Sequence, residues 1–213
     1  MDLSFEAFLK RLAARLQPAD SGNVPAAEEG LTHAAVTLLL RPAAGTAEGS
    51  PGDAAVDPAA GAEILFIKRA ERAGDPWSGH LAFPGGRAEK RDVTLLDVAM
   101  RETAEEVGID VRQGGRVLGR LATFRPLSAR IPSVTVTPFV AVAPQDAVPR
   151  VQLTEVEAAF WMSLAELRKT EGSALFSLEG REGTREFPAF PSPKGPIWGI
   201  TERILSQFLA LIG

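Results

Sequence analysis

The segment that most constrains this chain is an acidic helix, expected over residues 94–107 and bounded by strong start and stop signals. Asp92 or Thr94 can cap its start, because a short polar side chain accepts a hydrogen bond from a free backbone N–H. Gly108 can end it, because glycine adopts the left-handed conformation at little cost. Between these ends, residues at three-to-four spacing predict the face that packs on the rest of the protein: Leu96, Ala99, Met100, Thr103 and Val107.

A second face of the same helix carries Glu102, Glu105 and Glu106, at positions i, i+3 and i+4. These carboxylates repel one another near the C-terminal end of the helix, where the helix dipole disfavours each negative charge by about 0.3–1 kcal/mol. A choice that costs local stability suggests a function. Mg²⁺ or Mn²⁺ would remove the repulsion, and both ions prefer oxygen ligands. Acidic helix ends are also common on solvated surfaces, so the triplet alone leaves both interpretations open.

The surroundings of the helix favour the metal site. Arg101 precedes Glu105 by one helical turn and can hold a carboxylate with a forked hydrogen bond. Upstream, Pro84-Gly85-Gly86 predicts a tight loop whose backbone can approach a metal or a phosphate closely. The chain has 0 cysteines and 2 histidines, which excludes zinc-thiolate and multi-histidine sites.

The remaining sequence predicts one mixed α/β domain of the α+β type. We expect an N-terminal helix and linker over residues 1–30, followed by a domain over residues 31–213. Strands are expected over 34–40, 63–68, 117–123, 134–143 and 158–162, and the first two can pair as a hairpin. Further helices are expected over 3–16, 163–169 and 197–212, and loops over 43–61 and 171–195.

The net charge and the hydropathy of the chain limit the classes of partner that it can bind. A net charge of -4 and a pI near 5.4 give no support to nucleic-acid binding, which needs a basic surface. No apolar run is long enough to span a bilayer, and the N-terminus lacks the features of a secretory signal. We therefore expect a cytoplasmic protein that binds no membrane.

The glycine loop and the helix together resemble the Nudix box. That pattern is a glycine, five residues, a glutamate, seven residues, and then Arg-Glu-apolar-any-Glu-Glu-any-Gly-apolar. Residues 101–109, RETAEEVGI, match its second half except that Thr103 replaces the apolar residue. After Gly86 and five intervening residues the chain has Asp92 in place of the glutamate, and eight residues rather than seven then separate Asp92 from Arg101.

The resemblance implies a Nudix fold, an α-β-α sandwich around a mixed β-sheet, and hydrolysis of a phosphoanhydride bond. It implies that Glu102, Glu105 and Glu106 bind Mg²⁺ or Mn²⁺, joined by the carbonyl of Gly85, and that Arg101 orients these carboxylates. The expected catalytic residues are Arg101, Glu105 and Glu106. Glu105 and Glu106 are both candidates for the general base.

A box longer by one residue is similar to the coenzyme A diphosphatase branch, as is the segment 79–86, GHLAFPGG. Further similarity lies in VTPFV at 136–140, EVEAAFW at 155–161 and IWGIT at 197–201. The chain departs from that branch at Leu65-Phe66-Ile67, and at Asp75, where the branch has an arginine. The resemblance implies cleavage of coenzyme A into 4′-phosphopantetheine and adenosine 3′,5′-bisphosphate.

Two other functions remain open. The same chemistry can act on ADP-ribose or another nucleoside diphosphate derivative, or the chain can be a non-catalytic nucleotide sensor. The intact acidic triplet argues against a sensor, because a protein that only binds a nucleotide has no need of three repelling glutamates.

Several other residues have weaker signals. His80, Arg125 and Arg130 are candidate substrate-binding residues, because they lie in loops and the arginines can hold phosphates. Glu157 is a candidate fourth carboxylate, whereas Trp161 and Trp198 are expected to be packing residues. The two terminal helices either close the domain or cover a partner subunit, which leaves a homodimer open.

Overall fold

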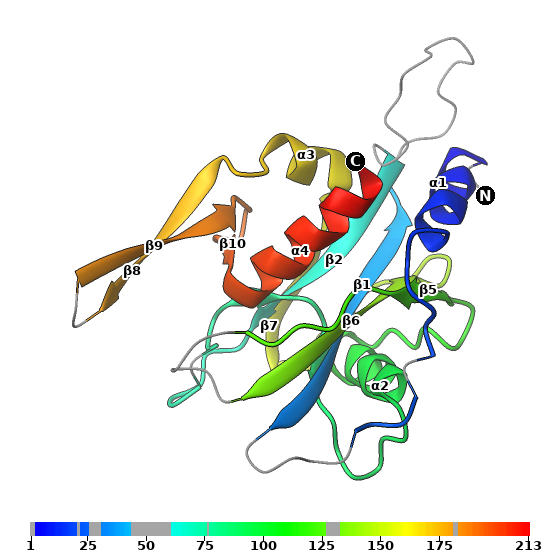
Figure 1. The fold of residues 1–213 in the computed structure, drawn as a ribbon, viewed down its shortest axis with the longest axis horizontal. Helices are drawn as coiled ribbons and strands as arrows, with labels where there is room; N and C mark the ends of the chain where they lie inside the picture. The colour runs from blue at the N-terminus through cyan, green and yellow to red at the C-terminus, as the bar shows by residue number, and fades with distance from the viewer. Residues whose placement is uncertain are drawn as a thin grey trace.

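A mixed β-sheet forms the centre of the protein in this computed structural model, which describes residues 3–20, 22–25, 31–43, 61–75, 77–126, 133–180 and 183–213 (Figure 1). Within these residues the central sheet consists of β1 (Thr32–Pro42), β2 (Ala62–Arg69), β3 (Leu81–Ala82), β4 (Gly85–Arg87), β5 (Arg116–Arg120), β6 (Val134–Val142) and β7 (Val156–Ser163).

Strand β1 organises this sheet. It runs parallel to β6 and antiparallel to β2 and β4, so the sheet is mixed as expected. The register of Leu40 with Ile64 confirms the predicted pairing of the first two strands. Strand β2 also pairs with β3 and β7, and β5 pairs with β6. Residues 85–87, expected as part of a tight loop, instead form the short strand β4, because their backbone pairs with β1.

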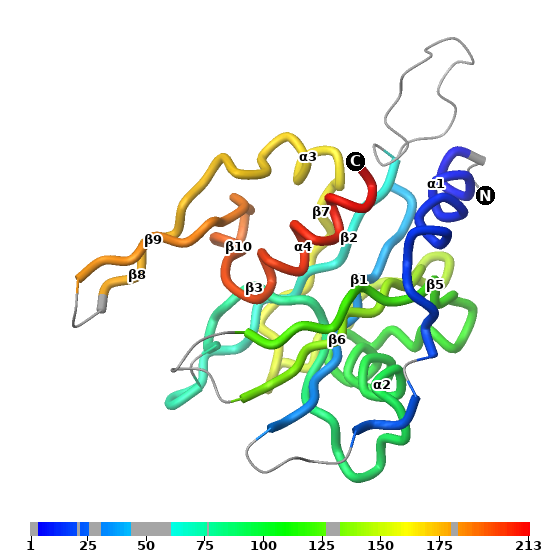
Figure 2. The backbone as a smooth tube through the Cα atoms, viewed as in Figure 1, coloured from blue at the N-terminus to red at the C-terminus, as the bar shows by residue number. Residues whose placement is uncertain are grey.

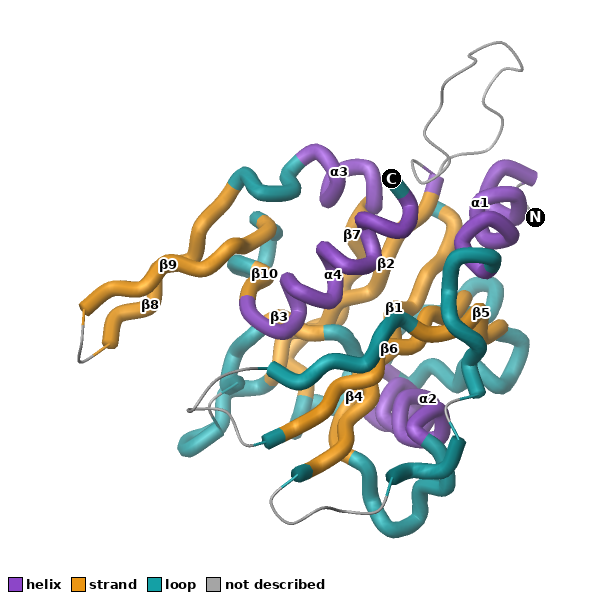
Figure 3. The backbone as a smooth tube through the Cα atoms, in the orientation of Figure 1, coloured by secondary structure: helices purple, strands orange, loops and turns teal. Residues whose placement is uncertain are grey.

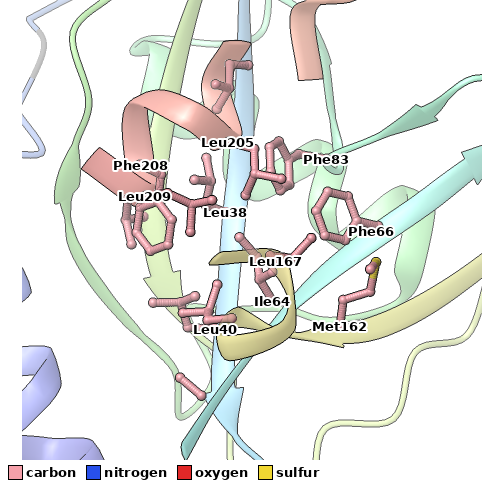
Figure 4. Packing of buried hydrophobic residues seen from close by; sticks show 14 of the residues in the cluster. Leu38, Leu40, Ile64, Phe66, Phe83, Met162, Leu167, Leu205, Phe208 and Leu209 are labelled. Carbon is pink, nitrogen blue, oxygen red and sulfur yellow. The ribbon is translucent and has the colours of Figure 1, made fainter. Parts of the chain in front are cut away.

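Helices cover both faces of the sheet, which confirms the predicted α-β-α sandwich. Helix α2 (Leu95–Val107) packs on one face, whereas α1 (Leu3–Ala13), α3 (Leu164–Lys169) and α4 (Gly199–Ile212) pack on the other (Figure 3). Successive strand residues point to opposite faces, so Leu38 and Leu40 meet α4 while Leu39 meets α2. Figure 4 shows the first of these cores, with Phe208 and Leu209 of α4 over the β1 side chains.

Helix α2 begins and ends as its sequence predicts. Thr94 is the N-cap and forms a capping box with Asp97, and Gly108 takes the left-handed conformation with φ 67° at the C-cap. The predicted packing face is largely confirmed, although Leu96 is only half-buried and Leu95 and Val98 are buried in its vicinity. Thr103 fits an apolar environment because its Oγ1 lies 2.7 Å from Ala99 O and 2.8 Å from Thr37 Oγ1.

The prediction of a loop over residues 171–195 was wrong. Strands β8 (Ala174–Gly180) and β9 (Gly183–Phe190) pair along their length, and β10 (Ile197–Trp198) pairs with the end of β9. The resulting hairpin extends away from the central sheet (Figure 2). Pro188 is the reason why the sequence did not predict β9, the central strand of the small sheet. Proline cannot donate a backbone hydrogen bond to a neighbouring strand, so its presence argues against a central strand. Helix α4 therefore begins at Gly199 rather than at Ile197.

The N-terminal helix closes one edge of the sandwich. Its residues Phe5, Phe8, Leu9 and Leu12 are buried in the same cluster as the apolar face of α4. Arg15 donates to Leu211 O, which links the two ends of the chain. Most of the predicted loop 43–61 lies outside the described residues. Of the helices that the structure describes, none is both long and apolar enough to cross a membrane.

Candidate active site

Glu106 is the most deeply buried member of the acidic face, with 2% of its surface exposed. Its Oε2 accepts a hydrogen bond from Gly85 N at 2.9 Å. The pKa of Glu106 is raised to about 8, mainly by burial and in smaller part by the nearby carboxylates of Glu102 and Glu155, whereas the Gly85 N–H and the charge of Arg69 oppose the rise. A buried carboxylate with a single backbone donor and anionic neighbours is poised to take up a cation or a proton.

The glycine loop brings its backbone against this carboxylate. Thr37 N donates to Pro84 O and Ala88 N donates to His33 O. Because hydrogen-bonded residues alternate along an antiparallel pair, the N–H and C=O of Gly85 point away from β1. The N–H reaches Glu106 Oε2, and the Gly85 carbonyl stays a predicted metal ligand.

Gly86 leaves room for Glu102. A Cβ at residue 86 would lie 2.3 Å from Glu102 Oε1, and a Cβ at Gly85 would lie 2.3 Å from Ala35 O. Only glycine at both positions allows the loop, the strand and the carboxylate to lie so close together. Burial raises the pKa of Glu102 also, although the hydrogen bond from Arg101 opposes this rise.

Arg101 is the cation at the centre of the cluster. Its Nη1 lies 2.8 Å from Glu102 Oε1 and 2.9 Å from Glu105 Oε2. Its Nε and Nη2 donate to the two carboxylate oxygens of Asp92, at 3.0 and 2.9 Å. Asp92 is not the helix cap; it anchors the guanidinium that positions the glutamates. The hydrogen bonds from Arg101 hold the pKa of Asp92 below its usual value despite burial.

In this arrangement the carboxylates are committed to partners within the protein. Glu105 is exposed and pairs with Arg91 as well as with Arg101. Among the described residues no three His, Cys, Asp or Glu side chains form a group that could hold a metal ion. To bind a cation together with Glu106, the carboxylates of Glu102 and Glu105 must rotate away from Arg101. The donor set still suits a hard cation, because it consists of oxygens, and Gly86 gives the Glu102 carboxylate room beside the loop.

The segment before β7 adds a carboxylate that the sequence did not single out. Arg150 N donates to Val107 O and Gln152 N donates to Glu106 O, so this segment caps the end of α2. It places Glu155 where its charge raises the pKa of both Glu102 and Glu106. Glu157, the residue considered from sequence, is half-exposed and pairs with Lys68 at 2.8 Å.

A second charged group borders the site at the end of β2. Arg69 pairs with Asp75 at 2.8 Å. Its charge opposes the rise in the pKa of Glu106 and contributes to the lowered pKa of His80. Burial is the main cause of the lowered pKa of His80, so this ring is neutral at pH 7. Asp75, which stands where the similar branch has an arginine, therefore holds Arg69 near the carboxylates.

The other candidate substrate residues are less connected to the cluster. Arg125 is exposed and donates to Ser133 Oγ at 2.8 Å, and Arg130 lies outside the described residues. Trp161 packs beside the core on the α2 face, with the Arg41 guanidinium 4.2 Å from its ring centroid, as a packing residue should. Trp198 contacts other rings instead. Substrate binding by His80, Arg125 and Arg130 stays a prediction.

The raised pKa of Glu106 predicts a pH-dependent stability without metal. Its folded pKa is about 8 and its unfolded pKa about 4.5, so between these values the folded state retains a proton that the unfolded state releases. The contribution of Glu106 to the free energy of unfolding is therefore fully present below pH 4.5 and is lost as the pH rises toward 8. In EDTA we expect a loss of about 3–4 kcal/mol between pH 5 and 8, which lowers the Tm by roughly 6–16 °C. Glu106→Gln should flatten this dependence; parallel curves for the two proteins would refute the assignment.

Comparison with known proteins is consistent with this geometry. Residues 53–178 match the model of the NUDIX domain. The chain is 33% identical over 131 residues to an uncharacterised protein of Schizosaccharomyces pombe, an alignment that spans 60% of this chain and 40% of that protein. It is 30% identical over 151 residues to the mitochondrial coenzyme A diphosphatase NUDT8 of Mus musculus, with 70% of each chain aligned.

Solved structures agree on the fold. A NUDIX hydrolase from Alicyclobacillus acidocaldarius superposes with a TM-score of 0.54 at 18% identity, covering 84% of this chain and 91% of that one. A MutT/nudix family protein from Enterococcus faecalis gives a TM-score of 0.54 at 17% identity, covering 86% of this chain and 62% of that one. Since the domain model covers residues 53–178 and a relative of 30% identity aligns over 70% of both chains, this chain belongs to the NUDIX family.

Proposed function

We propose that the protein is a divalent-metal-dependent pyrophosphohydrolase that cleaves coenzyme A or its derivatives. The products would be 4′-phosphopantetheine and adenosine 3′,5′-bisphosphate. The observation that carries the proposal is the acidic face of α2, in which the buried Glu106 and the half-buried Glu102 lie against Gly85 and Gly86. The named activity of the similar mouse protein supports coenzyme A as the substrate.

Each residue of the cluster has a distinct part in this proposal. Glu102, Glu105, Glu106 and the Gly85 carbonyl would hold Mg²⁺ or Mn²⁺. Bound there, the cation neutralises the diphosphate and activates water. Arg101, fixed by Asp92, sets the orientation of Glu102 and Glu105 and replaces the cation as their partner when the site is metal-free.

The reaction is a substitution at phosphorus. Water forms a bond to one phosphorus atom, the bond from that phosphorus to the bridging oxygen breaks, and the oxygen leaves with the second phosphate. The proton released by water goes to a base within the cluster, for which Glu105 and Glu106 are the candidates. Such a reaction needs positioning and charge neutralisation more than a covalent nucleophile, which fits a chain with 0 cysteines.

A substrate panel tests the proposal. Product formation is measured with coenzyme A, ADP-ribose and NADH, each with Mg²⁺, with Mn²⁺ and with EDTA. We expect coenzyme A to be cleaved with a kcat/KM at least about tenfold above the others, a difference of about 1.4 kcal/mol, and EDTA to abolish cleavage. Metal-dependent cleavage only of ADP-ribose or NADH would overturn the assignment of coenzyme A as the substrate, but it would support the proposed metal-dependent hydrolysis. Tight binding of a nucleotide without any product would instead indicate a sensor.

A further inference from the structure

Three rings gather around Trp198, at the junction of the small sheet and the segment that leads into the glycine loop. Trp198 stacks on Phe176 with centroids 4.4 Å apart and rings inclined by 25°. His80 and Phe187 meet the same indole at 4.8 and 5.6 Å. Strands β8, β9 and β10 and the turn before β3 thus each contribute one ring to what we call the Trp198 cluster.

The packing of the hydrophobic core does not account for this cluster. Among the residues that the structure describes, neither buried core cluster includes any of the four rings, and each ring is only half-buried. The next residues along β9 behave differently, because Ala189 and Phe190 are buried and attach the small sheet to the core. The rings therefore form a partly exposed aromatic surface on an anchored support.

Backbone contacts join this surface to the end of β2 and to the segment that leads into the glycine loop. Arg69 N donates to His80 O at 3.0 Å, and Thr201 Oγ1, at the start of α4, donates to Leu81 O at 2.9 Å. Strand β10 contacts β3, and both lie at the same end of α4 (Figure 2). The side chain of Arg69 pairs with Asp75 at 2.8 Å, so a charged pair at the end of β2 adjoins the segment that carries His80.

We propose that the Trp198 cluster is the subsite for the purine base of the substrate. The inference rests on the proposed function and adds to it, since it names the part of the nucleotide that the protein reads beside the diphosphate. A planar base fits stacked rings better than a flexible chain does, and stacking of one base on aromatic side chains contributes about 1–3 kcal/mol. The neutral ring of His80 adds a further flat face without repelling a base.

Binding of two ligands that differ only in the base tests this subsite. Adenosine 5′-monophosphate and ribose 5-phosphate are titrated calorimetrically into the protein with Mg²⁺. We expect the wild type to bind the nucleotide at least about tenfold more tightly than the sugar phosphate. Phe176→Ala and Trp198→Ala should reduce this ratio several-fold or more while leaving the sugar phosphate affinity unchanged, and Trp198→Phe should retain most of it.

The control is Leu175→Ala, since Leu175 neighbours Phe176 on β8 but points to the opposite face and is 62% exposed. Its binding ratio should equal that of the wild type. Phe176 lies on the hairpin that extends from the central sheet, so Phe176→Ala tests the subsite even where Trp198→Ala fails to fold. A wild-type ratio near one, or a ratio unchanged in Phe176→Ala, overturns the subsite. Because the readout needs no turnover, this failure is distinct from an absence of hydrolysis in the substrate panel.

Discussion

Replacing Glu106 with glutamine is expected to lower kcat by at least about a hundredfold without unfolding the protein. Glutamine keeps the shape of the side chain, and its carbonyl can still accept the hydrogen bond from Gly85 N. It removes the buried negative charge that would hold the cation. Loss of about 3 kcal/mol of transition-state stabilisation, which is within the range of a metal ligand, corresponds to this factor.

The measurement is steady-state product formation at saturating substrate and Mg²⁺. Glu157→Gln is the matched control, because it makes the same change on β7 at a half-exposed carboxylate that pairs with Lys68. Its kcat should stay within about twofold of the wild type, as expected for an exposed ion pair. A Glu106→Gln protein that turns over like the wild type would show that the proposed chemistry is wrong.

Arg101→Ala should destabilise the metal-free protein by about 3–5 kcal/mol. Only 12% of the Arg101 side chain and 3% of the Asp92 side chain are exposed, so the substitution leaves a buried carboxylate without its cation. Glu102 loses its charged partner as well. The expected fall in Tm is roughly 6–20 °C. The Tm of Arg101→Lys should lie between those of the wild type and Arg101→Ala, because lysine keeps the charge but lacks the forked donor.

Thermal unfolding in EDTA measures this effect. Arg116→Ala provides the comparison, because Arg116 pairs with Glu6 at 3.0 Å on the exposed surface, where an ion pair contributes about 0–1 kcal/mol. Adding Asp92→Asn to Arg101→Ala should recover part of the loss, because it removes the unpaired charge. Equal Tm values for Arg101→Ala and Arg116→Ala would mean that the Arg101 network does not stabilise the fold.

The parts of this structure that sequence predicts are those set by local chemistry. Thr94 and Gly108 bound α2 because a cap and a left-handed glycine are properties of a few adjacent residues. The acidic face follows from helical spacing for the same reason. Thr103 departs from the family pattern, and its partner Thr37 lies on a distant strand, so only the fold explains how its hydroxyl is satisfied.

The parts that sequence missed depend on contacts between distant segments. The charge of Glu155 acts on Glu102 and Glu106 because Gln152 N, in the same segment, caps the carbonyl of Glu106, a contact that no local pattern reveals. Asp92 contacts Arg101 from a loop whose length differs from the family pattern. The hairpin of β8 and β9 was not predicted because Pro188 and the polar residues on its exposed face are typical of a loop. With it, the ring contacts of Trp198 were missed.

Direct measurement of Mn²⁺ binding tests the central claim, that the α2 carboxylates hold a divalent cation. Free Mn²⁺ is followed by electron paramagnetic resonance as wild-type, Glu102→Gln, Glu106→Gln and Glu157→Gln proteins are titrated. We expect the wild type and Glu157→Gln to bind alike, and the other two to bind at least about tenfold more weakly, since even supporting groups of metal sites contribute 10–100-fold. Equal Mn²⁺ affinity in all four proteins, or no binding by the wild type, would contradict the account.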